Sequence, residues 1–329
     1  MTELDHWHPV LLSRELGDEP RAVTVCNRKL VVWRTETGVA ALEDACAHRG
    51  YPLHRGRVVD GCVECPYHGW RWDSEGRGAS PGNPRSKHCA TRFDAVERHG
   101  AVWVRARGSA TAFPFIDVGG HSLIGTARER ANAPLEVVLD NFIEVEHTPD
   151  VHVFLGYRRE DMARVETETT VTDDSVRVWN HGPQRPLPWA VRRLFDIPDG
   201  AYFVDDWVTR FSPVHSVYEQ YFLDGPHGRR VSDALRIAVF FTPVTDRVTD
   251  LFVLAYTSAS SWERPLLSAL RIPSMLALVR VEVMRDRKLL DAMGDAPIAL
   301  RNRALGRFDQ APVASRKLIE RIYRKRDEA

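Results

Sequence analysis

The chain has 329 residues, of which 43% are hydrophobic and 27% are charged. This length allows two ordinary domains or one large domain, and this hydrophobic content excludes a disordered chain. Lys and Arg together number 45, as do Asp and Glu, so the zero formal net charge gives no indication of a nucleic acid or an anionic membrane as partner.

The segment that opens the sequence, MTELDHWHPVLLSREL, is acidic and polar and is not a secretory signal peptide. The longest apolar stretch, 265–279, contains Arg271 and Pro273 and is too short to span a bilayer. Five cysteines in a chain of this length do not make a disulfide framework. We therefore expect a soluble cytoplasmic protein with no membrane partner, in which clustered Cys and His residues are metal ligands.

The first third of the chain predicts a small all-β domain over residues 1–112. Strand-like runs separated by turn residues occupy 22–26, 29–35, 39–44 and 92–106. Within this region lie Cys46-x-His48 and Cys65-x-x-His68, with sixteen residues between His48 and Cys65. A Rieske [2Fe–2S] centre takes two thiolates and two imidazoles as ligands, one such pair from each of two loops. Zinc also binds Cys₂His₂ sets, but zinc fingers place two cysteines together and then two histidines.

Residues 113–329 predict an α+β domain. Apolar residues recur with helical period over 133–147, and several strand-like runs follow between Arg164 and Tyr256. After the first helix come His147 and His152, five residues apart and separated by Pro149. Non-haem Fe(II) oxygenases bind iron with two histidines and one carboxylate, which leaves coordination positions open. A structural histidine pair without metal is the alternative.

Several segments resemble the Rieske non-haem iron oxygenases. The stretches DHWHPVLLSREL, ALEDACAHRGYPLHRGRV and VECPYHGWRWDSEGR are similar to the Rieske domain of that family, and RFDQAPVASRKLIERIYR is similar to its ending. The resemblance implies a Rieske domain with Cys46, His48, Cys65 and His68 as cluster ligands, followed by a helix-grip (START-like) catalytic domain. It is greatest for the branch of the vanillate and dicamba demethylases.

The resemblance also implies a mononuclear Fe(II) site. The family pattern Asn-x-x-Asp-x-x-His-x-x-x-x-His is matched at Asn141, His147 and His152, but Glu144 stands where most members carry Asp. In the family this acid is not an iron ligand; it links an iron-bound histidine to a cluster-bound histidine of the neighbouring subunit. Glu keeps the charge and adds a methylene, so we expect the same role with altered geometry.

The third iron ligand is expected on a late helix at 281–293. Its sequence VEVMRDRKLLDAM resembles the family's helix in which an Asp precedes another acid by five residues, which implies Asp286 as the ligand. Glu282 is the competing carboxylate. The alternative is that Asp286 pairs with Arg285 or Arg287 on a solvated face of the helix.

By this resemblance the chain is an enzyme, a terminal oxygenase that uses O₂ as cosubstrate. Because no G-x-G-x-x-G nucleotide motif is present, electrons must come from NAD(P)H through a separate ferredoxin or flavin reductase, and the family role of Glu144 implies a homotrimer. Many aromatic residues between Trp207 and Tyr256 favour a mostly apolar small molecule as substrate, and no Arg or Asp stands out there as a substrate clamp. Hydroxylation or demethylation is expected; the alternatives are desaturation, oxidative cyclisation, a non-catalytic electron carrier and a zinc-binding interaction module.

Overall fold

The computed structural model describes residues 3–232, 234–257, 265–300 and 303–326. Contacts within the chain divide it into two compact units. Unit 1 comprises Met1–Pro114 and Thr242–Asp246, and unit 2 comprises Phe115–Phe241 and Arg247–Ala329.

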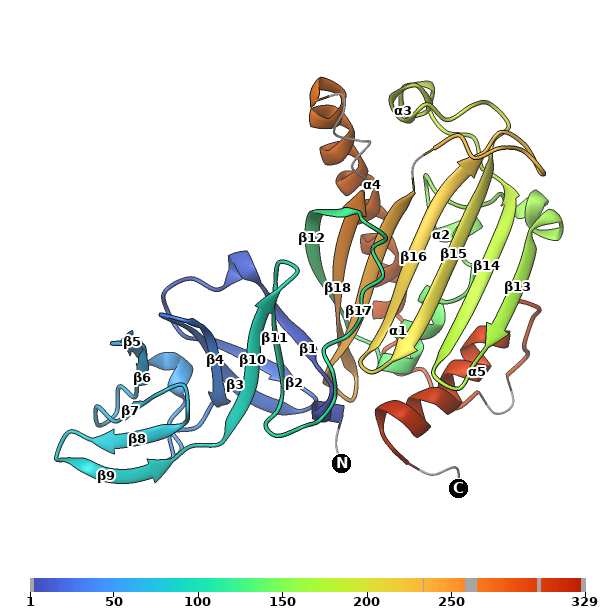
Figure 1. Ribbon diagram of the computed structural model, residues 1–329. Helices are drawn as coiled ribbons and strands as arrows, with labels where there is room; N and C mark the ends of the chain where they lie inside the picture. Colours follow the sequence, from blue (N-terminus) through green and yellow to red (C-terminus); the bar gives the residue numbers. More distant parts are fainter. Residues whose placement is uncertain (1–2, 233, 258–264, 301–302, 327–329) are drawn as a thin grey trace. The chain divides into compact units, whose positions relative to one another are not determined.

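Unit 1 consists of two antiparallel sheets, with strand orders β1-β11-β10-β4-β3-β2 and β5-β6-β7-β8-β9 (Figure 1). The strands are β1 (His8–Leu12), β2 (Arg21–Val25), β3 (Arg28–Thr35), β4 (Gly38–Glu43), β5 (Arg57–Val59), β6 (Cys62–Glu64), β7 (Arg71–Trp72), β8 (Arg77–Ser80), β9 (Asn83–Cys89), β10 (Arg92–Arg98) and β11 (Ala101–Ala106). Short 3₁₀ turns occur at Glu3–Asp5, Ser13–Glu15 and Leu53–Arg55. The predicted all-β character is confirmed.

Strand β3 shows why this region folds as a sheet. Its β-branched and aromatic residues Val31, Val32 and Trp33 are fully buried, so both faces of the strand are covered. On one face Val31 and Trp33 pack with Trp72 in a small core that also contains Cys46 and Cys65. The two cysteines of the sequence motif are thus anchored in the core of unit 1.

Unit 2 is a seven-stranded antiparallel sheet of order β12-β18-β17-β16-β15-β14-β13. The strands are β12 (Ser122–Ala131), β13 (Glu166–Val171), β14 (Ser175–Pro183), β15 (Tyr202–Phe211), β16 (Val214–Leu223), β17 (Leu235–Thr245) and β18 (Val248–Thr257). The helices are α1 (Leu135–Phe142), α2 (Thr148–Val151), α3 (Trp189–Phe195), α4 (Pro265–Asp291) and α5 (Gln310–Leu318), with a 3₁₀ helix at Arg159–Arg164 and a π-helical turn at Ile319–Tyr323. The predicted α+β class is confirmed.

The helices α1, α4 and α5 lie behind the sheet of unit 2 (Figure 1). Alternate residues of β15, such as Phe203 and Trp207, are buried in the core that these helices share with the sheet. Helix α4 contains Pro273 in its interior. Side chains of α1, α4, α5 and the central strands therefore face a common interior.

The expected single helix over 133–147 is wrong at its carboxyl end. Helix α1 ends at Phe142, and the one-turn helix α2 begins at Thr148. The carboxylate of Glu144 accepts the backbone N–H groups of Glu146 and His147, which a continued helix would bond to earlier carbonyls. Pro149 then favours a new helical start, because proline is tolerated in a first turn.

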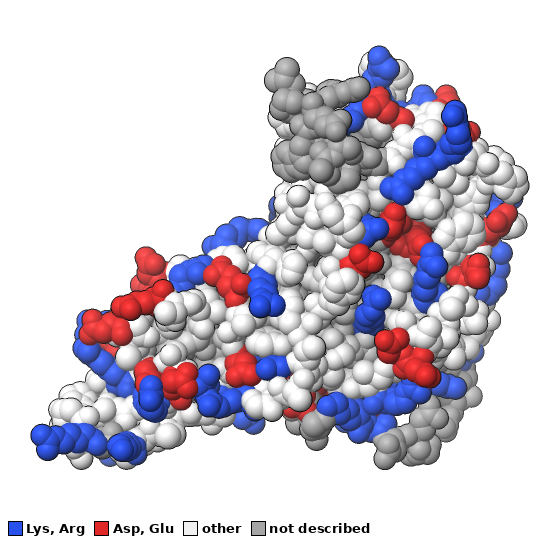
Figure 2. Space-filling view, in the orientation of Figure 1, with Lys and Arg blue, Asp and Glu red and all other residues white. Residues whose placement is uncertain are grey.

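Basic and acidic side chains are interspersed on the face seen in Figure 2, as the balanced composition predicts. No broad surface of a single sign covers either unit on that face. Among the residues that the structure describes, no helix combines the length and the apolar content that crossing a bilayer requires.

Candidate functional site

The two Cys–His loops of unit 1 have the same backbone conformation. The Cys46 N–H donates to the Tyr51 carbonyl (2.8 Å), and the Gly50 N–H donates to the Cys46 carbonyl (2.7 Å). In the second loop the Cys65 N–H donates to the Trp70 carbonyl (2.7 Å), and the Gly69 N–H donates to the Cys65 carbonyl (2.9 Å). Both glycines have φ near +69°, a left-handed conformation that favours glycine.

Each loop buries its cysteine and exposes its histidine. Cys46 and Cys65 are 2% and 1% exposed, whereas His48 and His68 lie at the surface with ring centroids 4.8 Å apart. Burial raises the pKa of the Cys65 thiol, and the neighbouring backbone N–H groups of Tyr67 and His68 oppose that effect. No disulfide joins any of the five cysteines. Two thiols beneath two imidazoles, held by matched loops, fit the ligand requirement of a Rieske cluster.

The second group of donors lies in unit 2, where α2 separates its two histidines. His147 and His152 flank the four residues of α2, and their rings are 4.9 Å apart and nearly perpendicular. Asp286 reaches them from α4 and is 4% exposed. Its Oδ1 lies 3.2 Å from His152 Nε2 and 3.4 Å from His147 Nε2. The three ligand atoms lie within 4.8 Å of one another, which is compatible with a single metal ion.

The charges of this group are strongly coupled. Burial opposes the protonation of His147, but hydrogen bonds with Asp286 and Glu144 raise its pKa to about 10. Burial also acts to raise the pKa of Asp286, but the two histidines hold it well below its usual range. A proton on His147 therefore balances the carboxylate, and a bound cation would take the place of that proton.

Glu144 fixes the orientation of His147. Its Oε1 accepts from His147 Nδ1 at 2.5 Å, while the opposite ring nitrogen, Nε2, faces Asp286. A hydrogen bond at Nδ1 selects the tautomer whose Nε2 can bind a metal. The family resemblance implies a role for Glu144 beside the iron rather than as its ligand, and the structure brings this carboxylate to the Nδ1 side of His147.

Glu282, the alternative candidate for the third iron ligand, binds backbone N–H groups instead of facing the histidines. It lies four residues before Asp286 on α4 and is 5% exposed. Its Oε1 accepts the backbone N–H groups of Phe154 (2.7 Å), Val153 (3.2 Å) and Leu155 (3.3 Å). Asp286, and not Glu282, is the α4 carboxylate that faces the two imidazoles.

Arg185 binds backbone carbonyl groups in the segment 148–157, which contains His152. Its guanidinium donates to the carbonyls of Thr148 (2.9 Å), Tyr157 (2.7 Å) and His152. Together Glu282 and Arg185 satisfy donors and acceptors of the backbone around His152, so this loop is fixed from two sides. Neither role could be predicted from the sequence, because no local pattern links either residue to the histidines.

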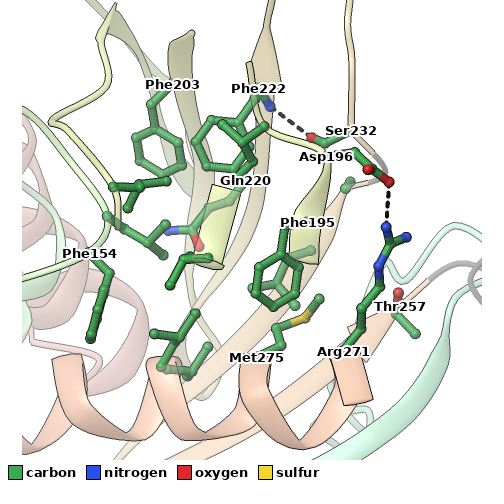
Figure 3. Close-up of a pocket in the computed structure, with 18 of the residues that line it drawn as sticks. Phe154, Phe195, Asp196, Phe203, Gln220, Phe222, Ser232, Thr257, Arg271 and Met275 are labelled. Atoms are coloured by element: carbon green, nitrogen blue, oxygen red, sulfur yellow. Dashed lines mark hydrogen bonds and ion pairs between the residues drawn. The ribbon is translucent and has the colours of Figure 1, made fainter. Parts of the chain in front are cut away.

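Two adjoining cavities open beside the histidines. The smaller has a volume of about 90 Å³ and is lined by Asn141, Glu144, His147, His152 and Asp286 among others. The larger, about 570 Å³, is mostly apolar, and Figure 3 shows the rings of Phe154, Phe195, Phe203 and Phe222 around it. Leu155, Phe203, Gln220 and Val279 line both cavities. A small molecule in the larger cavity would thus lie next to the donor cluster.

Asn141, the remaining candidate residue, lies in α1 and is 8% exposed. Its Nδ2 has no hydrogen-bond partner within the described part of the chain, and the side chain lines the smaller cavity. Asp205 also lines this cavity, and the sequence analysis missed it. The available signal was alternation along β15, which places this acid on the same face as Phe203 and Trp207.

Comparisons with known families cover most of the chain. Residues 6–113 match the family described as Rieske [2Fe-2S] domain. Residues 131–325, more than half of the chain, match the family described as vanillate O-demethylase oxygenase C-terminal domain.

Individual relatives match in part. Aminopyrrolnitrin oxygenase of Pseudomonas fluorescens is 34% identical over 165 residues, which is 44% of this chain and 45% of that protein. A vanillate O-demethylase oxygenase subunit of Pseudomonas sp. (strain HR199 / DSM 7063) is 31% identical over 225 residues, 63% of this chain and 62% of that protein. The matches thus span about half to three fifths of these relatives. The crystal structure of dicamba monooxygenase bound to dicamba has a TM-score of 0.78, with 22% identity and 98% of both chains covered, so it shares the fold.

Proposed function

Since the chain belongs to the Rieske non-haem iron oxygenases, with a catalytic domain of the vanillate O-demethylase type, we propose that it is the terminal oxygenase of a multicomponent system. In this proposal it accepts electrons from a separate ferredoxin or reductase supplied by NAD(P)H. It then uses O₂ to hydroxylate or demethylate a mostly apolar small molecule in the cytoplasm. The observation that carries the proposal is the convergence of His147, His152 and Asp286 beside an apolar cavity.

We assign the two cofactors of the family to the two donor sets, with a domain boundary near residue 112. Cys46, His48, Cys65 and His68 would hold the [2Fe–2S] cluster, and His147, His152 and Asp286 would hold Fe(II). When bound, the cluster supplies single electrons and the Fe(II) supplies the activation of O₂.

The protein's own residues prepare the Fe(II) site. Glu144 holds the proton of His147 at Nδ1, which leaves Nε2 for the metal. Glu282 and Arg185 fix the loop that carries His152. Asn141 presents its amide to the smaller cavity, where the reacting atom of a substrate would lie.

Glu144 also supports a proposal about assembly. Its bond to His147 is half of the link between an iron ligand and a cluster ligand. We propose that His48 or His68 of one copy contacts Glu144 of another copy, because both imidazoles are exposed. Such a head-to-tail contact closes as a ring, and a homotrimer is the assembly we expect.

The test is O₂ uptake by the anaerobically loaded protein with an added reductase and a panel of apolar ring compounds, followed by the product mass. A gain of one oxygen or the loss of a methyl group supports the proposal, and the loss of two hydrogens identifies a desaturase or cyclase. Iron content provides a second criterion: the oxygenase holds three irons per chain and an electron carrier holds two. A chain with two irons and no substrate-dependent uptake would contradict the proposal.

A further inference from the structure

Strands β15 and β16 place three facing pairs of side chains along the cavities. In the register of the sheet the pairs are Phe203 with Phe222, Asp205 with Gln220, and Trp207 with Tyr218. Since alternate residues of a strand share a face, one polar pair lies between two aromatic pairs on the inner face. Gln220 lines both cavities, whereas Asp205 lines only the smaller one.

Asp205 is an acid of intermediate exposure that lines the smaller cavity, where the nearby charges of His152 and His147 favour its ionised form. Its Oδ1 accepts one hydrogen bond, from Gln220 Nε2 at 3.1 Å. Among the described residues, no Lys or Arg forms an ion pair with it. Burial raises the pKa of Asp205 to about 6, and the Gln220 bond acts in the opposite direction. A carboxylate in such a place is costly unless a further donor reaches it.

Gln220 adds a second acceptor. With its Nε2 committed to Asp205, its Oε1 is buried and has no hydrogen-bond partner in the described part of the chain. Figure 3 shows the Gln220 amide among the rings of Phe154, Phe203 and Phe222. Three unpartnered groups that can donate, Asn141 Nδ2, Trp207 Nε1 and the Tyr157 hydroxyl, belong to residues that line only the smaller cavity. A molecule that passes from the larger cavity toward the histidines therefore meets the Gln220 acceptor before these donors.

We propose that Asp205, positioned by Gln220, selects substrates that carry an N–H or O–H donor on the end that enters the smaller cavity. This inference rests on the proposed function and narrows its substrate class to an apolar ring compound with such a donor. A molecule that would place a carboxylate at this point is disfavoured, because it brings a like charge and no donor.

The experiment measures binding without turnover. The full chain with its cluster and iron is dialysed to equilibrium under nitrogen, without reductase, against indole or indene. These probes have nearly the same shape, but indole carries an N–H where indene carries a CH₂. We expect the wild-type protein to bind indole about tenfold more tightly than indene. Equal binding of the two probes would overturn the proposal.

Substitutions at Asp205 test whether this residue causes the preference for indole over indene. Asp205→Leu is expected to abolish the preference for indole while indene binding persists. Asp206→Asn is the matched control: Asp206 neighbours Asp205 on β15, points to the other face and pairs with Arg177, so the preference should remain. If Asp205→Leu does not fold, Asp205→Asn should reduce the preference at least threefold. A tenfold preference that remains in Asp205→Leu, or that is not reduced in Asp205→Asn, would overturn the proposal.

The result of the binding experiment can be distinguished from the result of the O₂-uptake test of the proposed function. If the indole preference depends on Asp205 but no compound is oxidised with an added reductase, the proposed function fails and the binding assignment stands. If compounds are oxidised but the preference is absent, the oxygenase stands and the assignment of Asp205 fails.

Discussion

Glu282 and Asp286 lie one helical turn apart on α4, yet their carboxylates hold different parts of the same site. Asp286 faces the Nε2 atoms of His147 and His152, whereas Glu282 accepts backbone N–H groups of the segment that follows His152. One acid is therefore available to a metal, and the other is committed to the loop that carries a ligand. Substitutions at the two positions should have different consequences.

Removal of the Asp286 carboxylate should abolish mononuclear iron binding and leave the cluster in place. In Asp286→Ala we expect iron to fall from three to two per chain, with an unchanged cluster absorption spectrum.

Glu282→Gln keeps one acceptor oxygen and should weaken iron binding about 10–100-fold. Iron analysis after graded chelation measures both effects, with Lys288→Gln, on the exposed face of α4, as control. An unchanged iron content in Asp286→Ala would remove this residue from the ligand set.

Loss of the Glu144 charge should slow electron delivery more than it affects iron content. Glu144→Gln retains an acceptor for His147 Nδ1 but has no negative charge to stabilise a protonated or metal-bound imidazole. We expect three irons per chain and a rate of substrate-dependent cluster reoxidation that is about 10–100-fold lower. Stopped-flow absorbance of the prereduced cluster measures this rate. Glu146→Gln, at an exposed neighbour, is the control, and equal rates in the two variants would contradict a role for Glu144.

The parts of the site that are local in the chain could be predicted from the sequence. Each Cys–His loop is closed by bonds that span four and five residues, so the spacing of Cys46, His48, Cys65 and His68 carries the geometry. His147 and His152 likewise flank one helical turn. Asp286 lies 134 residues beyond His152, and no periodicity links positions so far apart. Its assignment rested on the resemblance alone.

Other features depend on tertiary structure. Asp205 and Gln220 meet only because β15 and β16 pair in one register, and apolar patterning sets that register without indicating which polar residues will face each other. The end of α1 at Phe142 was missed for a different reason. Residues 143–147 retain helical periodicity, but the Glu144 side chain captures the N–H groups that the helix needs.

Two buried histidines should make the stability of each unit depend on pH. Burial lowers the pKa of His8, on β1, and of His215, on β16, to about 4 in each case. The unfolded chain binds protons at these positions between pH 6.5 and 4 while the folded chain does not, so stability falls as the pH decreases through that range. Each histidine should cost about 3 kcal/mol by pH 4.

Denaturant unfolding at several pH values tests this dependence for each unit. His215→Phe should be less stable at pH 7 by about 1 kcal/mol, because the bond to the Pro213 carbonyl is lost. It should also show a flatter pH dependence between pH 6.5 and 4. His227→Gln, at an exposed position, should keep the slope of the wild type. A slope that His215→Phe leaves unchanged would contradict the burial argument.

The glycines that close the two cluster loops should be intolerant of a side chain. Gly50 and Gly69 share a φ near +69°, where an L-residue costs about 1–2 kcal/mol. A Cβ at Gly50 would meet no atom within 4 Å, whereas one at Gly69 would lie 3.1 Å from Pro81 Cγ. We therefore expect Gly69→Ala to lose more cluster than Gly50→Ala.

Cluster absorbance per chain, together with the thermal unfolding temperature, measures this order. Gly17→Ala is the matched control, because Gly17 is exposed, does not have the left-handed conformation and has no atom within 4 Å of an added Cβ. If all three variants retain the cluster equally, backbone conformation does not limit the loops. If Gly50→Ala is impaired as much as Gly69→Ala, the left-handed backbone accounts for the effect and the contact with Pro81 adds nothing.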